Sequence, residues 1–203
     1  MTTRLFLIRH GETAWSLTGR HTGRTDLPLT ENGERRASLL RARLQGIEFT
    51  RVLASPLQRA RRTCELAGLG AVARMEPDLQ EWNYGDYEGR TTDDIRAQHP
   101  GWDVFQDGCP QGESVEQVSL RADRVLAGLR RLDGTVALFS HGQFLRTLAM
   151  RWIGRPASDG RHFDLATASV SVLGYEHSDR LNPVISLWNA GANASDFPAA
   201  DAT

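Results

Sequence analysis

Lysine is absent from this chain: all 24 of its basic residues are arginine, and 25 acidic residues give a formal net charge of -1. Enzymes that form a Schiff base, including those that use pyridoxal phosphate, need a lysine amine. The phosphate loop of nucleoside triphosphatases needs the lysine of its Gly-Lys-Ser/Thr ending. Both classes are excluded. For most positions the arginine bias reflects a GC-rich genome, with the side chains on solvated helix faces.

Other features that the sequence lacks bear on the partners of the protein and on its location in the cell. The arginines form no basic block, so we expect no nucleic-acid partner. No apolar run approaches the roughly 20 residues of a membrane helix, so we expect no membrane partner. The first nine residues look like a strand rather than a signal peptide. Cys64 and Cys109 are too few for a disulfide scaffold and lack metal-ligand spacing. We therefore expect a cytoplasmic protein with two free thiols.

The chain alternates strand-like and helical patterns, and its length suits one domain. Apolar runs predict strands at 5–8, 52–54, 136–139, 170–175 and 184–187. Apolar spacing predicts helices beginning at Thr30, after an N-cap at Ser55-Pro56, after a Ser114/Gln117 capping box, and at Gln143. Such alternation predicts an α/β fold with a mainly parallel sheet covered on both faces. We expect one domain over 1–190 and a loose tail over 191–203.

Two predicted strands end in a similar way. The first runs into Arg9-His10-Gly11 and the third into Ser140-His141-Gly142. In parallel sheets ligands bind at the carboxyl ends of the strands, so we expect both histidines at a site. Two long polar segments, 12–29 and 80–113, interrupt the alternation. Long connections in a compact domain usually carry function.

The residues around His10 leave two interpretations open. A lone histidine after a buried strand is more often structural than catalytic. A metal site would need further ligands at short spacing, and without an HExxH motif or an aspartate-rich loop we expect neither metal nor cofactor. The neighbouring Arg9 favours an anion site, because guanidinium forks bind phosphate through two parallel hydrogen bonds.

A series of short motifs in the first 150 residues is more specific than any of these patterns. They are Leu7-Ile8-Arg9-His10-Gly11-Glu12-Thr13, Gly19-Arg20, Thr22-Gly23, Asp26-Leu27-Pro28-Leu29-Thr30, Gly33, Ser55-Pro56-Leu57-Gln58-Arg59-Ala60 with Thr63, the segment 79–89, Gly112-Glu113-Ser114 and Ser140-His141-Gly142. In this order they resemble the histidine phosphatase superfamily, also called the phosphoglycerate mutase-like family. The resemblance implies a three-layer α/β/α sandwich with a mainly parallel central sheet.

The resemblance also implies roles for five residues. His10 matches the nucleophile that becomes a phosphohistidine. Arg9, Arg59 and His141 match the cationic pocket around the phosphoryl oxygens, where charge stabilisation matters most. Glu81 matches the general acid that protonates the leaving group and then activates water.

Further residues are expected to contact the substrate. They are Ser16, Thr22, Gly23, Tyr84, Gly142, Gln143 and Arg146. Thr22 would supply a hydroxyl and Gly23 a backbone donor, while Arg146 would hold a second anionic group. Ser16 and Gln143 depart from the residues common in the family, asparagine and glycine. The remaining histidines are expected at the surface: His21, His99, His162 and His177.

The resemblance favours hydrolysis over isomerisation. Mutases of the family carry a longer, basic insertion after the glutamate, whereas here about 25 residues separate Glu88 from Ser114 and lysine is absent. Several segments look closest to small bacterial acid phosphatases and a fungal sugar-bisphosphatase. We expect a metal-independent phosphomonoesterase acting on small phosphoesters such as sugar phosphates or sugar acids, with a homodimer as a further option. The alternatives are a cofactor-dependent phosphoglycerate mutase and a non-catalytic phosphoprotein-binding domain.

Overall fold

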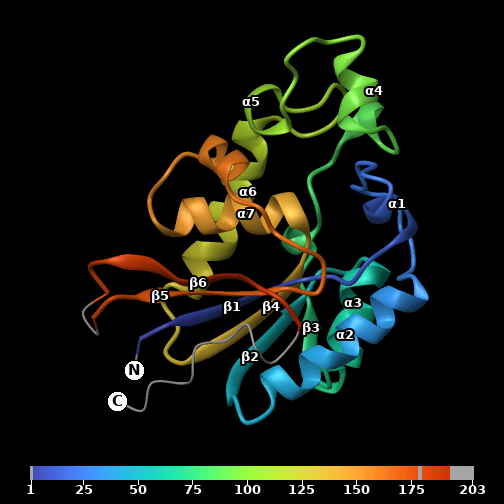
Figure 1. The fold of residues 1–203 in the computed structure, drawn as a ribbon. Helices are drawn as coiled ribbons and strands as arrows, with labels where there is room; N and C mark the ends of the chain where they lie inside the picture. Colours follow the sequence, from blue (N-terminus) through green and yellow to red (C-terminus); the bar gives the residue numbers. More distant parts are fainter. Residues whose placement is uncertain (1, 178–179, 193–203) are drawn as a thin grey trace.

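A six-stranded sheet between two layers of helices forms the frame of the computed structural model, which describes residues 2–177 and 180–192 (Figure 1). The strands are β1 (Arg4–Arg9), β2 (Phe49–Ala54), β3 (Ala73–Met75), β4 (Thr135–Ser140), β5 (Val170–Tyr175) and β6 (Pro183–Ala190). Their order is β3-β2-β4-β1-β5-β6. The first four in this order are mutually parallel, and β5 and β6 are antiparallel additions at one edge. The predicted mainly parallel α/β sandwich is confirmed.

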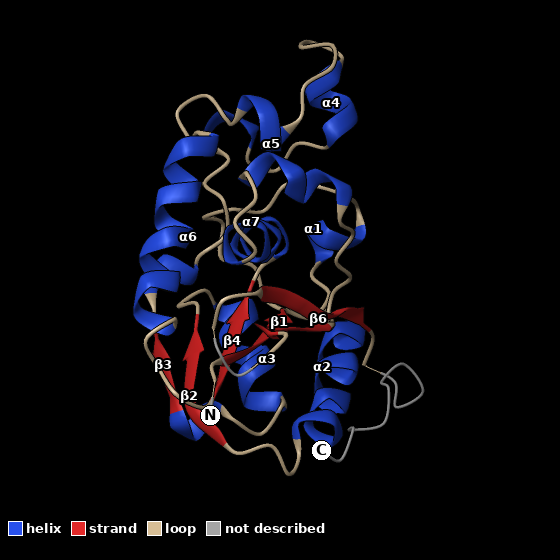
Figure 2. Cartoon of the chain, turned by 90° about the vertical axis from the view of Figure 1, so that its left-hand side faces the viewer, coloured by secondary structure: helices blue, strands red, loops and turns tan. Residues whose placement is uncertain are grey.

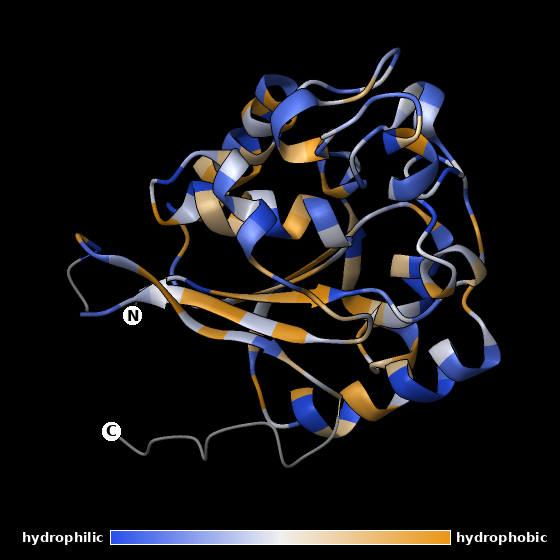
Figure 3. Ribbon diagram, turned by 45° about the horizontal axis from the view of Figure 1, so that its top comes forward, coloured by the Kyte–Doolittle hydropathy of each residue, from blue (hydrophilic) through white to orange (hydrophobic). Residues whose placement is uncertain are grey.

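Alternating side chains of β1 enter two separate cores, as the period of two in a strand requires. Leu5 and Leu7 face α6 and α7, whereas Phe6 and Ile8 face α2 and α3. These helices are α2 (Glu31–Leu44), α3 (Gln58–Leu66), α6 (Val115–Leu129) and α7 (Gly142–Trp152). The strands are mostly hydrophobic along their length, while the helices alternate hydrophobic and polar residues (Figure 3). Burial on both faces makes β1 and β4 rigid supports for the residues that follow them.

Two predicted helix starts are confirmed and one is displaced. The Thr30 side chain caps α2, and Ser114 with Gln117 forms the capping box of α6. Helix α3 begins at Gln58 with Leu57 as N-cap, so the predicted start at Ser55-Pro56 is wrong. The Ser55 hydroxyl lies 2.8 Å from His141 Nε2, and Asp26 Oδ1 accepts the Gln58 N–H at 2.8 Å. The Ser55 hydroxyl therefore contacts the histidine that follows β4. Asp26, from segment 12–29, supplies the hydrogen-bond acceptor at the start of α3.

The two long polar segments fold into short elements beyond the carboxyl ends of the strands. They contain α1 (Ala14–Leu17), α4 (Thr92–Arg96) and α5 (Val104–Asp107), and the 3-10 turn η3 (Gly85–Tyr87). Three more 3-10 turns occur elsewhere, η1 (Gly70–Val72), η2 (Pro77–Leu79) and η4 (Ala157–His162). Helices α4 and α5 form the end of the molecule opposite the sheet (Figure 2). The region between this end and the sheet is where the functional residues meet.

The described chain ends at Ala192, just beyond β6. Ala192 is buried, and its carbonyl oxygen accepts a hydrogen bond from Arg43 Nε at 3.1 Å. Most of the predicted loose tail, residues 193–203, lies outside the described residues, and the boundary at 190 stays a prediction. None of the described helices has the length and apolar character needed to cross a membrane.

Candidate active site

The two histidines that end predicted strands lie side by side. In the parallel pair of β1 and β4, Arg9 is opposite Ser140, so His10 and His141 leave the sheet together, with ring centroids 5.1 Å apart. A cavity of about 230 Å³ opens at this point. Seven of the predicted site residues line it: Arg9, His10, Ser16, Thr22, Glu81, Tyr84 and Gln143. Both long polar segments reach this cavity.

His10 is held in the tautomer that a nucleophile needs. Its side chain is buried, and its Nδ1 lies 2.7 Å from the carbonyl oxygen of Gly11. A carbonyl oxygen only accepts, so Nδ1 carries the proton and Nε2 keeps its lone pair. Burial, followed by the charges of Arg59 and Arg9, holds the pKa of His10 well below its usual range. The imidazole is therefore neutral at neutral pH.

Arg59 is fully buried and forms the second rigid part of the site. Its Nη1 donates to the carbonyl oxygen of Thr25 at 2.9 Å, and its Nη2 donates to those of Thr22 and Gly23 at 3.0 and 2.9 Å. Its Nε donates to His141 Nδ1 at 3.1 Å. The guanidinium plane is thus fixed by four acceptors behind the cavity wall.

The bond from Arg59 also defines the state of His141. Because Nδ1 accepts, the proton of this ring is on Nε2, which donates to the Ser55 hydroxyl at 2.8 Å. Burial, then the charge of Arg59, holds the pKa of His141 well below its usual range. His141 is therefore a neutral ring whose two nitrogens both bind protein atoms, and it supports Arg59 rather than adding a charge of its own.

Thr63, on α3, links the loop after β1 to the main chain of Arg59. The Thr63 hydroxyl accepts the Gly11 N–H at 3.0 Å and donates to the Arg59 carbonyl oxygen at 2.7 Å. Gly11 has no room for a side chain, since a Cβ there would lie 2.7 Å from the Gly33 carbonyl oxygen. The loop that carries His10 is consequently fixed relative to the helix that carries Arg59.

The side-chain carboxylate of Glu81, from a distant segment of the chain, lies at the N-terminal end of α7. Its Oε1 accepts the N–H groups of Trp82 and Phe144, each at 2.9 Å, and its Oε2 accepts that of Gln143 at 3.1 Å. The N-cap residue of α7 makes no side-chain cap hydrogen bond, so Glu81 satisfies free N–H groups of the first turn from another segment. The positive end of the helix dipole also favours a carboxylate there. These contacts hold the carboxyl group against the cavity that contains His10.

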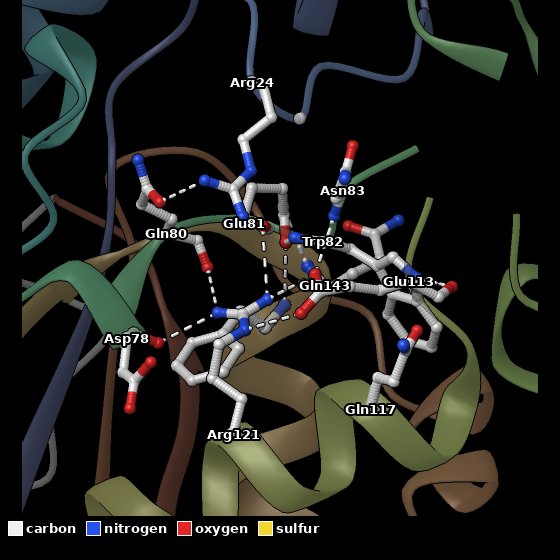
Figure 4. A network of polar contacts seen from close by, with 12 residues as sticks. Arg24, Asp78, Gln80, Glu81, Trp82, Asn83, Glu113, Gln117, Arg121 and Gln143 are labelled. Carbon is white, nitrogen blue, oxygen red and sulfur yellow. Dashed lines mark hydrogen bonds and ion pairs between the residues drawn. The ribbon is translucent and has the colours of Figure 1, made fainter. Parts of the chain in front are cut away.

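The backbone that carries Glu81 is itself bound by a buried ion pair (Figure 4). Arg121 Nε and Nη2 donate to the two carboxylate oxygens of Glu113, each at 2.8 Å. The same guanidinium donates to the carbonyl oxygens of Asp78, Gln80 and Glu81, at 2.9, 2.6 and 3.2 Å. We call Arg121 and Glu113 the clamp. The clamp holds the main chain of Glu81 in position, and neither of its two residues lines the cavity.

The sequence interpretation gave Arg121 no role. A signal was present, because Arg121 falls between Val118 and Ala122 on the apolar face of α6, where all three are buried. A charged residue in a buried stripe needs a partner. That partner, Glu113, appeared in the motif series without a function.

Three residues that were predicted to contact the substrate make other contacts in the structure. The Ser16 hydroxyl accepts from the Thr13 N–H at 2.8 Å and donates to its carbonyl at 3.0 Å, which caps α1. The Gly23 N–H donates to Glu88 Oε1 at 2.8 Å, so the expected donor to the phosphoester is already used. Gly142 packs on Arg9, whose Cζ would lie 3.3 Å from a Cβ at this position. Gly142 therefore makes room for the guanidinium.

His21 is the residue whose placement differs most from expectation. It was predicted at the surface, yet it is half-buried, with ring centroids 4.6 Å from Tyr84 and 5.3 Å from Trp102. Its Nε2 lies 3.2 Å from the Thr92 hydroxyl, and burial lowers its pKa to about 4. It lines the cavity next to Thr22. The contacts come from residues more than 60 positions away, and no local pattern indicates them.

The described residues include no group of three or more histidine, cysteine or carboxylate side chains arranged to hold a metal ion. The chemistry that the cavity offers comes from the side chains that line it: the neutral imidazole of His10, the guanidinium groups of Arg9 and Arg20, and the carboxyl group of Glu81.

Comparison with known proteins agrees with this arrangement. The model of the histidine phosphatase superfamily (branch 1) matches residues 5–190. An acid phosphatase of Mycobacterium tuberculosis is 45% identical over 91% of this chain and 92% of its own. A sedoheptulose 1,7-bisphosphatase of Saccharomyces cerevisiae is 34% identical over 76% of this chain and 69% of its own.

The fold comparison gives the same result. The solved structure of an open reading frame product from Mycobacterium tuberculosis matches with a TM-score of 0.89 and 40% identity, covering 95% of this chain and all of that one. The family model covers nearly the whole described chain, including both histidine-bearing strand ends and the segment of Glu81. The protein is a member of branch 1 of the histidine phosphatase superfamily.

Proposed function

We propose that the protein is a phosphatase that hydrolyses phosphomonoesters of small metabolites through a covalent phosphate on His10 Nε2. The observation that carries this proposal is the hydrogen bond between His10 Nδ1 and the Gly11 carbonyl oxygen. It leaves Nε2 unprotonated in a cavity lined by Arg9 and Glu81. A neutral, oriented imidazole is an activated nucleophile.

The first step forms the bond from His10 Nε2 to phosphorus and breaks the bond from phosphorus to the ester oxygen. Glu81, carrying a proton in this step, gives it to the departing oxygen. The charges of Arg9 and Arg59 stabilise the negative charge that spreads over the phosphoryl oxygens. Arg9 Nη1 donates to the Leu165 carbonyl oxygen, while its buried Nε has no hydrogen-bond acceptor among the described residues. Arg9 is thus anchored at one end and retains donor capacity at the cavity.

The second step releases the phosphate from the histidine. A water attacks the phosphorus and gives a proton to the Glu81 carboxylate, the bond from phosphorus to Nε2 breaks, and the imidazole returns to its starting state. The three N–H groups that bind Glu81 fix the position of its carboxyl group for both steps.

The substrates that we propose are sugar phosphates and phosphorylated sugar acids. The two relatives support this class, since one is named as an acid phosphatase and the other as a bisphosphatase of a sugar. A cytoplasmic location is part of the proposal and is supported by Cys64 and Cys109, which are both buried and unpaired. A homodimer remains a prediction.

The test is the substitution His10→Ala, assayed on an aryl phosphate. We expect kcat to fall by at least about 10⁴-fold, since loss of a nucleophile removes most of an enzyme's acceleration. His177→Ala, at an exposed position, is the matched control and should retain the wild-type rate. A denaturing quench at alkaline pH, where the bond between phosphorus and a histidine nitrogen survives, should trap one phosphoryl group of the wild type on the peptide that contains His10, and a chelator should leave its rate unchanged. Wild-type activity in His10→Ala would refute the mechanism.

The same preparation separates the alternatives. With a bisphosphate primer, rapid interconversion of 2- and 3-phosphoglycerate would assign a mutase instead. Absence of any turnover, with binding of phosphopeptides, would assign a binding domain. The presence of His10, Arg9 and Glu81 around one cavity favours catalysis over binding alone.

A further inference from the structure

A second cavity, of about 140 Å³, adjoins the one that contains His10. The two share His21, Thr92 and Gln143 in their walls. At neutral pH this shared wall carries no net charge, because two of its side chains are an amide and a hydroxyl and the third is a half-buried imidazole with a pKa of about 4. A small molecule that occupies the first cavity can therefore continue into the second along a neutral polar surface.

Three arginines from three different elements line the second cavity. Arg96 ends α4, Arg146 belongs to α7, and Arg161 belongs to η4. We call them the arginine triad. Gln143 and Arg146 are three residues apart on α7, which places them on one face of the helix and connects the two cavities.

Each triad arginine is anchored by its Nε alone. Arg96 donates to the Trp102 carbonyl oxygen at 2.9 Å, Arg146 to the Gly160 carbonyl oxygen at 2.8 Å, and Arg161 to His162 Nε2 at 3.1 Å. Within residues 2–177 and 180–192, none of the three forms an ion pair with a carboxylate, and their Nη atoms have no acceptor. Arg146 is half-buried, whereas Arg96 and Arg161 are exposed, and the single bonds orient the three side chains while leaving their terminal donors unused.

The charge in this cavity is unbalanced. One carboxylate, that of Asp103, lines it against the three guanidinium groups, and Asp103 Oδ1 already accepts the Phe105 N–H at 2.8 Å. Arg146 packs its Cζ 4.6 Å from the centre of the Phe105 ring, and burial lowers its pKa. Keeping an unpaired charge half-buried costs free energy, which an anion bound beside it offsets.

We propose that the arginine triad binds a second anionic group of the substrate while the first occupies the cavity of His10. The substrate class is then a phosphomonoester that carries a phosphate or a carboxylate at its other end. Both groups are flat or tetrahedral oxyanions that guanidinium forks bind well. This inference rests on the proposed phosphatase function. It adds the residues that determine which phosphomonoesters the enzyme prefers.

The experiment compares substrates that differ only in the distant group. Fructose 1,6-bisphosphate is paired with fructose 1-phosphate, and 3-phosphoglycerate with glycerol 3-phosphate. For each pair the measured quantity is the ratio of kcat/KM for the doubly anionic substrate to that for the singly anionic one. The wild type should prefer the doubly anionic member of at least one pair, and the pair concerned tells whether phosphate or carboxylate is bound.

The variants Arg161→Met and Arg146→Met should reduce this ratio by about 10–100-fold, the loss of one or two charge-assisted hydrogen bonds. Arg161 is exposed, so its substitution leaves folding intact even if Arg146→Met does not. Arg35→Met, an exposed arginine of α2 paired with Glu31, should leave the ratio within about twofold of the wild type.

The outcomes separate this inference from the function on which it rests. If the wild type hydrolyses no phosphoester, the proposed function fails. If it hydrolyses all of them but shows no preference within either pair, or if the triad variants keep the wild-type ratio, then the phosphatase stands and the second anion site is refuted.

Discussion

Two groups of arginines in this protein differ in how many of their donors the protein itself uses. Arg59 makes four hydrogen bonds and Arg121 makes five, mostly to main-chain carbonyl oxygens. Each arginine of the triad makes one. The fully bonded arginines hold loops and strands in place, as the rigid five-donor fork permits. The triad arginines keep their donors for something that the described chain does not supply.

Substitution of Arg121 should have the largest effect on stability, because the clamp is buried. Arg121→Met leaves the Glu113 carboxylate largely buried, at 15% side-chain exposure, without its partner. Breaking such a pair costs about 3–5 kcal/mol in free energy of unfolding. The loss is measured by urea denaturation. If the arginine served only as a surface charge, the change would stay below about 1 kcal/mol.

A double variant tests the cause of that loss. In Arg121→Met/Glu113→Leu neither charge remains, so part of the stability should return. Equal losses in the single and double variants would show that the bonds to the carbonyl oxygens of Asp78, Gln80 and Glu81, rather than the ion pair, stabilise this region.

The clamp also shows where sequence reasoning stops. The strands, the starts of α2 and α6 and the catalytic candidates at the strand ends follow from apolar spacing, capping residues and motifs that are local in the chain. Arg121 bonds to acceptors 40 or more positions away, and in the sequence it is one of 24 arginines. Only the folded chain separates the arginines that hold the frame from those that face a cavity.

The displaced start of α3 has a similar cause. A serine before a proline is a good local signal for a helix start. Ser55 instead bonds to His141, 86 positions along the chain, and Asp26 accepts the Gln58 N–H. Local preference was overridden by two contacts within the candidate active site, where such conflicts are expected.

Substitution of Arg59 should give the next largest effect, and we expect it on activity as well as on stability. In Arg59→Lys a single ammonium replaces a planar fork that reaches His141 and three carbonyl oxygens from opposite sides. We expect kcat on an aryl phosphate to fall by about 10²–10³-fold, as for loss of one preorganised donor to a developing charge. Arg62→Lys, on the exposed face of the same helix, is the control. A near-wild-type rate for Arg59→Lys would mean that positive charge alone, without the fork, is sufficient.

The smallest effect concerns His21, which lies in the wall between the two cavities. Its pKa of about 4 is depressed by burial from the ordinary value of 6.5. Below pH 6.5 the unfolded chain therefore binds a proton that the folded chain does not, so stability falls as the pH decreases from about 6.5 towards 4. His10 and His141 have lowered pKa values and act in the same direction.

The contribution of His21 to this pH dependence of stability can be measured with His21→Gln, which keeps a polar side chain beside Thr92. Between pH 7 and pH 5 the wild type should lose about 1–2 kcal/mol more unfolding free energy than this variant, with screening at a half-buried ring already allowed for. Urea denaturation at the two pH values measures the difference, and the exposed His162→Gln should behave as the wild type. An unchanged pH dependence in His21→Gln would mean that the ring titrates normally. The wall between the cavities would then become positively charged in mild acid, and the neutral passage from His10 to the arginine triad would exist only at higher pH.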